Sequence, residues 1–217
     1  MSLPDVLLSL LREPMSGTDL IRLFKSSIQH FWKTDLSQIY RALENLESKG
    51  LVRSESVPSA RGPARKVYHL NDDGRTRLLD WIATEPRIPP VKFEYLAQIF
   101  SVTADPDPSG RAREMLWSMR DEAAAGLATL KGIDAALARV PGYPNDMPAA
   151  FFYPWLTLRH GIQRRRALLD WIDECLERLD ARNPEADVPG EDNDTMAHLA
   201  LILNQLADGS PADVPSK

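Results

Sequence analysis

The segment from Thr34 to Val52, TDLSQIYRALENLESKGLV, decides the fold because it predicts a helix with two different faces. Asp35 is suited to the N-cap, and Gln38 stands three residues later, where a capping box has Glu or Gln. Gly50 stands where a left-handed residue commonly ends a helix. An apolar stripe at spacings of three and four residues consists of Leu36, Ile39, Leu43 and Leu46. The pattern predicts a helix over residues 35–49.

The opposite face of this helix carries hydrogen-bonding side chains, namely Ser37, Gln38, Arg41 and Asn45. The major groove of DNA is about 12 Å wide and accepts a helix with such a face. Gln38 can bind adenine, whereas Arg41 can bind guanine or a phosphate. Ser37 and Tyr40 have the right length for phosphate oxygens. Taken alone, the same face also fits a solvated surface helix, and Tyr40 also fits a half-buried core position.

The elements on either side of this helix complete a pattern. Two helices are predicted before it, over residues 4–12 and about 17–30, and Ser16 is a suitable N-cap for the second. After it, two alternating runs flank the loop PSARGPA and predict a β-hairpin. A further helix over about 73–84 is expected to bury Leu78, Leu79 and Ile82. Three helices followed by a hairpin are the order of a winged helix-turn-helix, whose third helix enters the major groove.

The hairpin tip is basic. Arg61, Arg65 and Lys66 surround a Gly62–Pro63 pair, and we expect these three cations to contact DNA phosphates. A solvated loop is the alternative. The net charge of −5 does not oppose this interpretation, because it is unevenly distributed. Residues 1–84 hold 12 Lys and Arg against 10 Asp and Glu, whereas residues 85–217 hold 14 against 21.

The second half of the chain carries helical patterns only. Helices are predicted over about 91–101, 109–140 and 150–181, with a last one around Met196, Leu199, Leu203 and Leu206. The 109–140 helix carries an apolar heptad seam over four repeats. The helix that packs against this seam lies either in the same chain or in a second subunit. For a homodimer, which a two-fold DNA site requires, the candidate interface residues are Leu116, Met119, Leu130, Leu137, Leu169 and Leu176.

Composition argues against several other classes. No apolar run is long enough to span a membrane, and the early apolar stretch lacks a basic region before it and contains Asp5. Cys175 is the single cysteine, so an intrachain disulfide and a multi-cysteine metal cluster are excluded. The four histidines are widely spaced, and no nucleophile, phosphate-loop or zinc motif occurs. We expect a cytoplasmic protein that is not an enzyme and has no metal or cofactor.

The second half also holds several aromatic residues. Trp117, Phe152 and Trp155 could line a pocket for a small aromatic effector. Ordinary packing of an aromatic core or of a dimer interface is the alternative.

Three segments resemble the PadR family of transcriptional regulators: LLSLLREPMSGTDL (7–20), FWKTDLSQIYRALENLESKGLV (31–52) and GPARKVYHLNDDGRTRLLDW (62–81). The family's Gln-x-Tyr-Arg core is matched by residues 38–41, and its Gly-x-x-Arg-Lys-x-Tyr wing is matched by residues 62–68. The chain departs from the family at Ser16–Gly17–Thr18, where relatives commonly carry His-Gly-Tyr. The resemblance covers residues 1–83.

The resemblance implies a mainly α protein with three parts. These are a winged helix-turn-helix DNA-binding domain with a two-stranded wing (1–84), an all-α dimerisation and effector domain of long helices (85–207) and a disordered tail (208–217). It implies a homodimer that binds double-stranded operator DNA, represses transcription and is released by a small aromatic effector. A helical protein–protein interaction module without specific DNA binding is the alternative.

Overall fold

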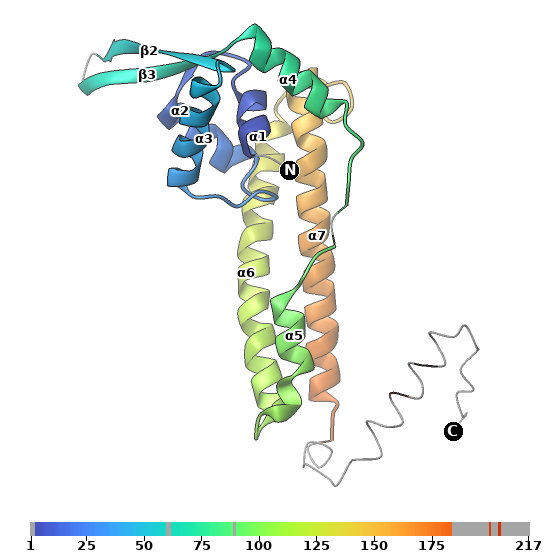
Figure 1. Cartoon of the computed structure of the whole chain (residues 1–217). Helices are drawn as coiled ribbons and strands as arrows, with labels where there is room; N and C mark the ends of the chain where they lie inside the picture. The colour runs from blue at the N-terminus through green and yellow to red at the C-terminus, as the bar shows by residue number, and fades with distance from the viewer. Residues whose placement is uncertain (1–2, 60–61, 89, 184–199, 201–203, 205–217) are drawn as a thin grey trace. The chain divides into compact units, whose positions relative to one another are not determined.

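A computed structural model of the 217-residue chain describes residues 3–59, 62–88 and 90–183, together with residues 200 and 204. The predicted tail 208–217 lies outside these residues, as do Met196, Leu199, Leu203 and Leu206 of the last predicted helix. The elements are α1 (Leu3–Leu10), β1 (Met15–Ser16), α2 (Gly17–Ser27), α3 (Leu36–Ser48), β2 (Val52–Ser59), β3 (Gly62–Leu70), α4 (Asp72–Ile82), α5 (Glu94–Phe100), η1 (Val102–Ala104), α6 (Pro108–Leu137) and α7 (Ala149–Asp180) (Figure 1).

These elements belong to two units. The first unit comprises residues 1–92 and 125–167, and the second comprises residues 93–124 and 168–217. Both long helices span the two units, since α6 passes from one to the other at residues 124–125 and α7 at residues 167–168. A sequence pattern treats each of these helices as one uninterrupted element, so it carries no sign of such a division.

The first unit contains the predicted winged helix-turn-helix. Its apolar core is formed by α1, α2 and α3 with one residue from each long strand, and it consists of Val6, Leu7, Leu8, Leu11, Leu20, Phe24, Ile28, Ile39, Ala42, Leu43, Leu46, Val52 and Tyr68. Ser16 caps α2 by accepting a hydrogen bond from the backbone N–H of Asp19 at 3.2 Å. The mainly α fold class, the three-helix order and the two-stranded wing are confirmed.

The sheet has three antiparallel strands in the order β1-β3-β2. The strands β2 and β3 form the hairpin, from the pair Val52–Leu70 to the pair Ser59–Gly62, and they extend side by side past α2 and α3 (Figure 1). Strand β1 pairs Met15 with Tyr68 and Ser16 with Val67. The sequence does not predict β1, because two residues are too short to show an alternating pattern.

Helix α4 packs on α1 through a charged contact. Asp5 of α1 is buried, and its carboxylate accepts a hydrogen bond from Nε of Arg77 at 3.0 Å. Leu78 packs against the core as predicted, but Leu79 and Ile82 are 61% and 63% exposed, so the prediction that they are buried is wrong. The buried side of α4 is the one that carries Leu78 and Trp81, and Leu79 and Ile82, each one residue further along the helix, lie beside it in solvent.

The loop after α2 contacts α7 within the first unit. Nε2 of His30 lies 3.1 Å from the carbonyl oxygen of Thr157. The ring passes close over Gly161, where a Cβ atom would come within 2.8 Å of Cδ2 of His30. Burial lowers the pKa of His30, with smaller contributions from the charges of His160 and Arg165 and opposed by the hydrogen bond to Thr157. Burial therefore favours a neutral imidazole at this position.

We expect the burial of His30 to cost the folded protein stability in acid. Because the folded state lowers the pKa of His30, the unfolded chain binds its proton first as the pH falls below about 6.5, and the folded state loses stability there. Above that pH both states are neutral at this position. Urea unfolding of the wild type and of His30→Gln at about pH 7.5 and about pH 5.5 measures the effect. The drop in unfolding free energy should be smaller in the variant, and equal drops would contradict the assignment.

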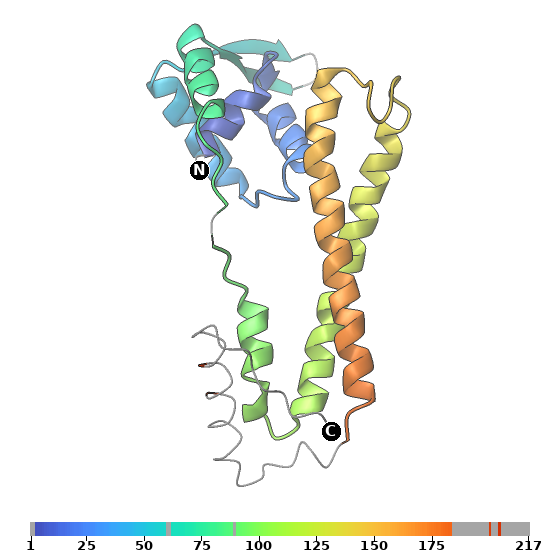
Figure 2. The same cartoon turned by 90° about the vertical axis from the view of Figure 1, so that its right-hand side faces the viewer.

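In the second unit, α5 packs against α6 and α7 (Figure 2). Its core consists of Leu116 on α6 and Ile172 and Leu176 on α7, with Ile99 of α5 against them. Two ion pairs join the long helices, Arg113 to Asp180 at 2.8 Å and Arg120 to Asp173 at 2.6 Å. Part of the heptad seam thus has its partner in the same chain.

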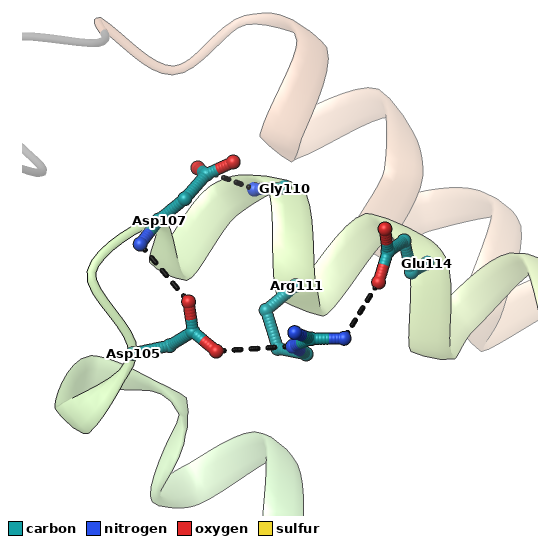
Figure 3. A network of polar contacts seen from close by, with 5 residues as sticks. All are labelled: Asp105, Asp107, Gly110, Arg111 and Glu114. Carbon is teal, nitrogen blue, oxygen red and sulfur yellow. Dashed lines mark hydrogen bonds and ion pairs between the residues drawn. The ribbon is translucent and has the colours of Figure 1, made fainter.

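A chain of polar contacts holds the start of α6 (Figure 3). The Asp107 carboxylate accepts from the backbone N–H of Gly110 at 2.9 Å, and the Asp105 carboxylate accepts from the backbone N–H of Asp107 and from Nε of Arg111, each at 3.0 Å. Arg111 also donates to Glu114 at 2.7 Å. These bonds lower the pKa of Asp105, with the backbone bond from Asp107 as the largest cause. The bond to Gly110 occupies one of the N–H groups that an α-helix leaves unpaired at its start.

Candidate nucleic-acid interface

The N-terminal end of α3 is fixed by Asp35. Its carboxylate accepts from the backbone N–H of Gln38 at 2.7 Å and from the Ser37 hydroxyl at 2.6 Å. These bonds lower the pKa of Asp35, with the Ser37 bond as the largest cause. The predicted N-cap is confirmed. The Gln38 side chain has a different partner, because its Oε1 accepts from the Thr34 hydroxyl at 2.7 Å.

One face of α3 is exposed and polar, whereas the other lies in the core. Ile39, Leu43 and Leu46 are buried, while the exposed side chains include Ser37, Gln38, Arg41 and Asn45. Leu36, the first residue of the predicted apolar stripe, is 47% exposed at the start of the helix, so the stripe is buried only from Ile39 onward. The guanidinium of Arg41 bonds to Ser37 of its own helix, at 3.3 Å to the carbonyl oxygen and 3.5 Å to the hydroxyl. Such long bonds on an exposed side chain are easily exchanged for a ligand. The helix therefore presents donors and acceptors on a surface that is held rigidly from behind.

Tyr40 lies at the boundary between the core and the solvent. Its side chain is partly exposed, and its ring packs against the start of α2. A Cβ atom at Gly17 would lie 3.1 Å from Cε1 and 3.6 Å from the hydroxyl oxygen of Tyr40. The ring is thus supported by Gly17 while part of its surface remains accessible. The close packing of this ring also explains why a residue without a side chain stands at position 17 of the segment Ser16–Gly17–Thr18.

The wing cations have different surroundings. Arg65 is exposed and makes no hydrogen bond or ion pair within the described residues. Nζ of Lys66 lies 2.6 Å from Oε2 of Glu47, which is in the last turn of α3. Arg61 lies outside the described residues. Sequence reasoning missed Glu47, because its partners lie on the strands that follow rather than at helical spacing on its own helix.

The aromatic residues proposed as an effector site divide between the units. Phe152 and Trp155 are in the first unit, with ring centroids 6.0 Å apart, and Trp117 is in the second. The carboxylate of Asp134 accepts from the Trp155 indole N–H at 2.9 Å and from the Tyr143 hydroxyl at 3.0 Å. These bonds fasten the turn between α6 and α7. The sequence does not single out Asp134, because its partners lie beyond that turn.

An apolar cavity of about 310 Å³ lies in the second unit, among α5, η1 and the adjoining parts of α6 and α7. Its wall includes Ile99, Leu116, Cys175 and Leu179, but none of the three proposed effector residues. Burial raises the pKa of the Cys175 thiol, which keeps it protonated and makes it a poor nucleophile.

The proposed dimerisation residues differ in how much surface they retain. Leu116, Leu130 and Leu176 are already buried within one chain, and Met119, Leu137 and Leu169 are partly buried. Exposed apolar side chains in the second unit include Leu96 and Phe100 on α5 and Trp117 on α6. These side chains have more surface to offer a second subunit.

The described residues carry neither a membrane-spanning helix nor a metal site. No helix there is long and apolar enough to cross a membrane. No group of three or more His, Cys, Asp or Glu residues is placed to hold a metal ion within the same described part of the chain.

A polar helix supported by two others and followed by a β-hairpin defines a winged helix-turn-helix protein. Residues 6–80 match the Transcriptional regulator PadR-like family, and residues 92–180 match the Virulence activator alpha C-term family. A probable transcriptional regulator of Mycobacterium tuberculosis is 33% identical over 189 residues, which are 82% of this chain and 98% of that protein. The chain belongs to the PadR-like family of transcriptional regulators, which is not a family of enzymes.

Solved structures of relatives have the same fold. The negative transcriptional regulator PadR of Bacillus subtilis is 26% identical over 80% of this chain and 95% of its own length. Its structure with operator DNA matches 82% of this chain and 98% of that chain, with a TM-score of 0.70 and 25% identity, and its complex with p-coumaric acid gives a TM-score of 0.66. The Vibrio cholerae virulence activator AphA is 29% identical over 83% of this chain and 99% of that chain, with a TM-score of 0.65.

Proposed function

We propose that this protein is a homodimeric repressor that binds operator DNA in the cytoplasm. The observation that carries the proposal is α3, whose exposed side carries Ser37, Gln38, Arg41 and Asn45 while its other side is anchored in the core. Each subunit would place α3 in the major groove, where Gln38 and Arg41 reach base edges. Ser37, Tyr40, Arg61 and Arg65 would bind phosphates. Bacillus subtilis PadR has been crystallised with operator DNA, which supports DNA binding by this chain.

A gel shift with the DNA upstream of the protein's own gene tests the proposal. A sequence-specific regulator should bind that DNA more tightly than a scrambled duplex, and the affinity should fall as salt rises, because bound counterions are released. A helical interaction module without DNA affinity would shift neither duplex at either of two salt concentrations. That result would reject the proposal.

We expect Arg41→Ala to weaken operator binding by about 1–3 kcal/mol and to relax specificity at one base position, because a base contact by arginine is lost. Titration of the variant against the operator and single-base variants of it measures both effects. Arg178→Ala is the control, since Arg178 is exposed on α7 and pairs with Glu174 of its own helix. A uniform loss on every sequence would instead assign Arg41 to a phosphate.

The homodimer rests on the symmetry of DNA sites and on exposed apolar surface. Two-fold operators are bound by two-fold proteins. Leu96 and Phe100 lie one turn apart on α5 and are exposed, as is Trp117. Apolar surface of this kind commonly marks a protein interface. Sedimentation equilibrium of the whole chain tests the assembly, and a monomer at the concentrations used for the gel shift would contradict it.

A small aromatic effector is the second part of the proposal. Phe152 and Trp155 form an aromatic pair in the first unit, and the relative from Bacillus subtilis has been crystallised with p-coumaric acid. An effector would act by favouring a conformation that binds DNA less well, which needs a coupling of about 1–3 kcal/mol. Adding p-coumaric acid to the gel shift tests this class of ligand. An unchanged operator affinity would remove it from consideration.

A further inference from the structure

Glu47 occupies an electrostatically unfavourable position in α3. It lies in the last turn of the helix, where the unpaired carbonyl groups carry a partial negative charge. A carboxylate at this end of a helix is destabilising unless cations or hydrogen-bond donors compensate it. The compensation comes from outside the helix, since both partners of Glu47 lie on the wing strands.

The two carboxylate oxygens of Glu47 bind different strands. Oε1 accepts a hydrogen bond from the Ser54 hydroxyl on β2, and Oε2 accepts from Nζ of Lys66 on β3 at 2.6 Å. Ser54 pairs with Tyr68 in the hairpin, two residues from Lys66. A single side chain of α3 therefore holds both strands of the wing near its base.

Lys66 and Arg65 lie on opposite faces of the hairpin. Successive side chains of a strand alternate between faces, so Lys66 shares a face with Tyr68, which is 3% exposed and part of the core. Nζ of Lys66 lies 5.3 Å from the centroid of the Tyr68 ring. Arg65 is on the other face and is exposed. The two neighbouring cations thus have different surroundings despite their equal charge.

The pKa shifts of Glu47 and Lys66 agree with an ion pair between them in the folded protein. The hydrogen bond from Lys66, followed by that from Ser54, lowers the pKa of Glu47. The bond to Glu47 raises the pKa of Lys66. The Lys66 side chain is 50% exposed and that of Glu47 33% exposed, so solvent and salt screen the pair. A Lys66 charge that is already paired gains less from a phosphate, because the Glu47 carboxylate already neutralises it.

We propose that Glu47 is a positioning residue for the DNA interface, and that it binds Ser54 and Lys66 to fix the wing against the C-terminal end of α3. Lys66 then contributes to DNA affinity by holding the wing and not by neutralising a phosphate. This inference rests on the proposed function and revises the role expected for Lys66. A wing that is fixed before binding loses less conformational freedom on the duplex, which favours association.

The salt dependence of operator binding separates the two roles. Each phosphate contact adds about one to the slope of the logarithm of affinity against the logarithm of salt concentration. We expect Lys66→Met to lower affinity about 2- to 5-fold, the range of an exposed ion pair, and to leave the slope unchanged. Glu47→Gln should have the same effects. The matched control is Arg65→Met, which removes the same charge from the neighbouring position and should reduce the slope by about one.

Two results would overturn the inference. A slope reduced by about one in Lys66→Met would make Lys66 a phosphate contact. A higher affinity in Glu47→Gln would show that Glu47 withholds Lys66 from DNA instead of positioning the wing. The double variant Lys66→Met/Glu47→Gln should bind like either single variant, because both changes break the same pair.

Hydrogen exchange of the unbound protein tests the same contact without DNA. Amides of β2 and β3 should exchange faster in Lys66→Met and in Glu47→Gln than in the wild type, and Arg65→Met should leave them unchanged. Unchanged exchange in both variants would reject the positioning role whatever the DNA result. If the wild type binds no DNA but the exchange changes as expected, the proposed function fails while the contact between Glu47 and the wing stands.

Discussion

Gly74→Ala is expected to lower the unfolding free energy by about 3 kcal/mol, the upper end of the usual cost of overpacking. Gly74 is buried near the start of α4, and an added Cβ atom would overlap the carbonyl oxygen of Leu51 and come within 2.8 Å of Cδ1 of Leu70. The Leu51 carbonyl also accepts from the backbone N–H of Asn71 at 3.2 Å. Backbone cannot move aside as a flexible side chain can, so α4 would have to shift and strain this bond.

Gly132→Ala is the matched control for this prediction. Gly132 is exposed within α6, and an added Cβ atom would meet nothing within 4 Å. Because glycine is unfavourable inside a helix, we expect this change to stabilise the protein by about 0.5–1 kcal/mol. Urea unfolding of the wild type and both variants measures the difference. Similar free energies for Gly74→Ala and the wild type would contradict the close approach of α4 to Leu51.

Leu43→Ala is expected to lower the unfolding free energy by about 2–5 kcal/mol. Leu43 is fully buried on the inner side of α3, in the core shared with α1, α2 and the strands. The change removes apolar contacts and leaves a cavity that a close-packed core fills only in part. Because this core supports the polar face of α3, operator affinity should also fall at temperatures where the variant is partly unfolded.

Leu79→Ala is the control for Leu43→Ala. The same three carbon atoms are removed, but Leu79 is 61% exposed on α4, so we expect a change within about 0.5 kcal/mol. Thermal or urea unfolding of the two variants side by side checks the contrast. Equal losses of unfolding free energy would mean that burial does not determine how much Leu43 contributes to stability.

Local sequence patterns predicted the DNA-binding half well. The N-cap at Asp35, the apolar stripe of α3 and the alternation after Gly50 each depend on residues close together in the chain. Such features follow from the periods of helix and strand, which a sequence shows directly. The spaced motifs at residues 38–41 and 62–68 indicated the family, because members of that family carry the same motifs in the same order.

The contacts between elements were not predictable in this way. Glu47 and Lys66 are separated by 19 residues, and they meet only because the hairpin register places Lys66 on the face shared with Tyr68. A shift of one residue would have placed Arg65 there instead. The exposed positions of Leu79 and Ile82 depend likewise on tertiary packing, because Leu78 and Trp81 are the residues of α4 that pack against the core.

The sequence by itself determined the helices, the hairpin, the polar face of α3 and membership of the PadR-like family, because these follow from local periodicity and spaced motifs. Only the tertiary structure decided that Glu47 holds Lys66, that β1 joins the sheet, and that Leu116 packs against Ile172 and Leu176 of its own chain. Strand register and helix packing determine these contacts. They depend on side chains that are distant along the chain and close in space.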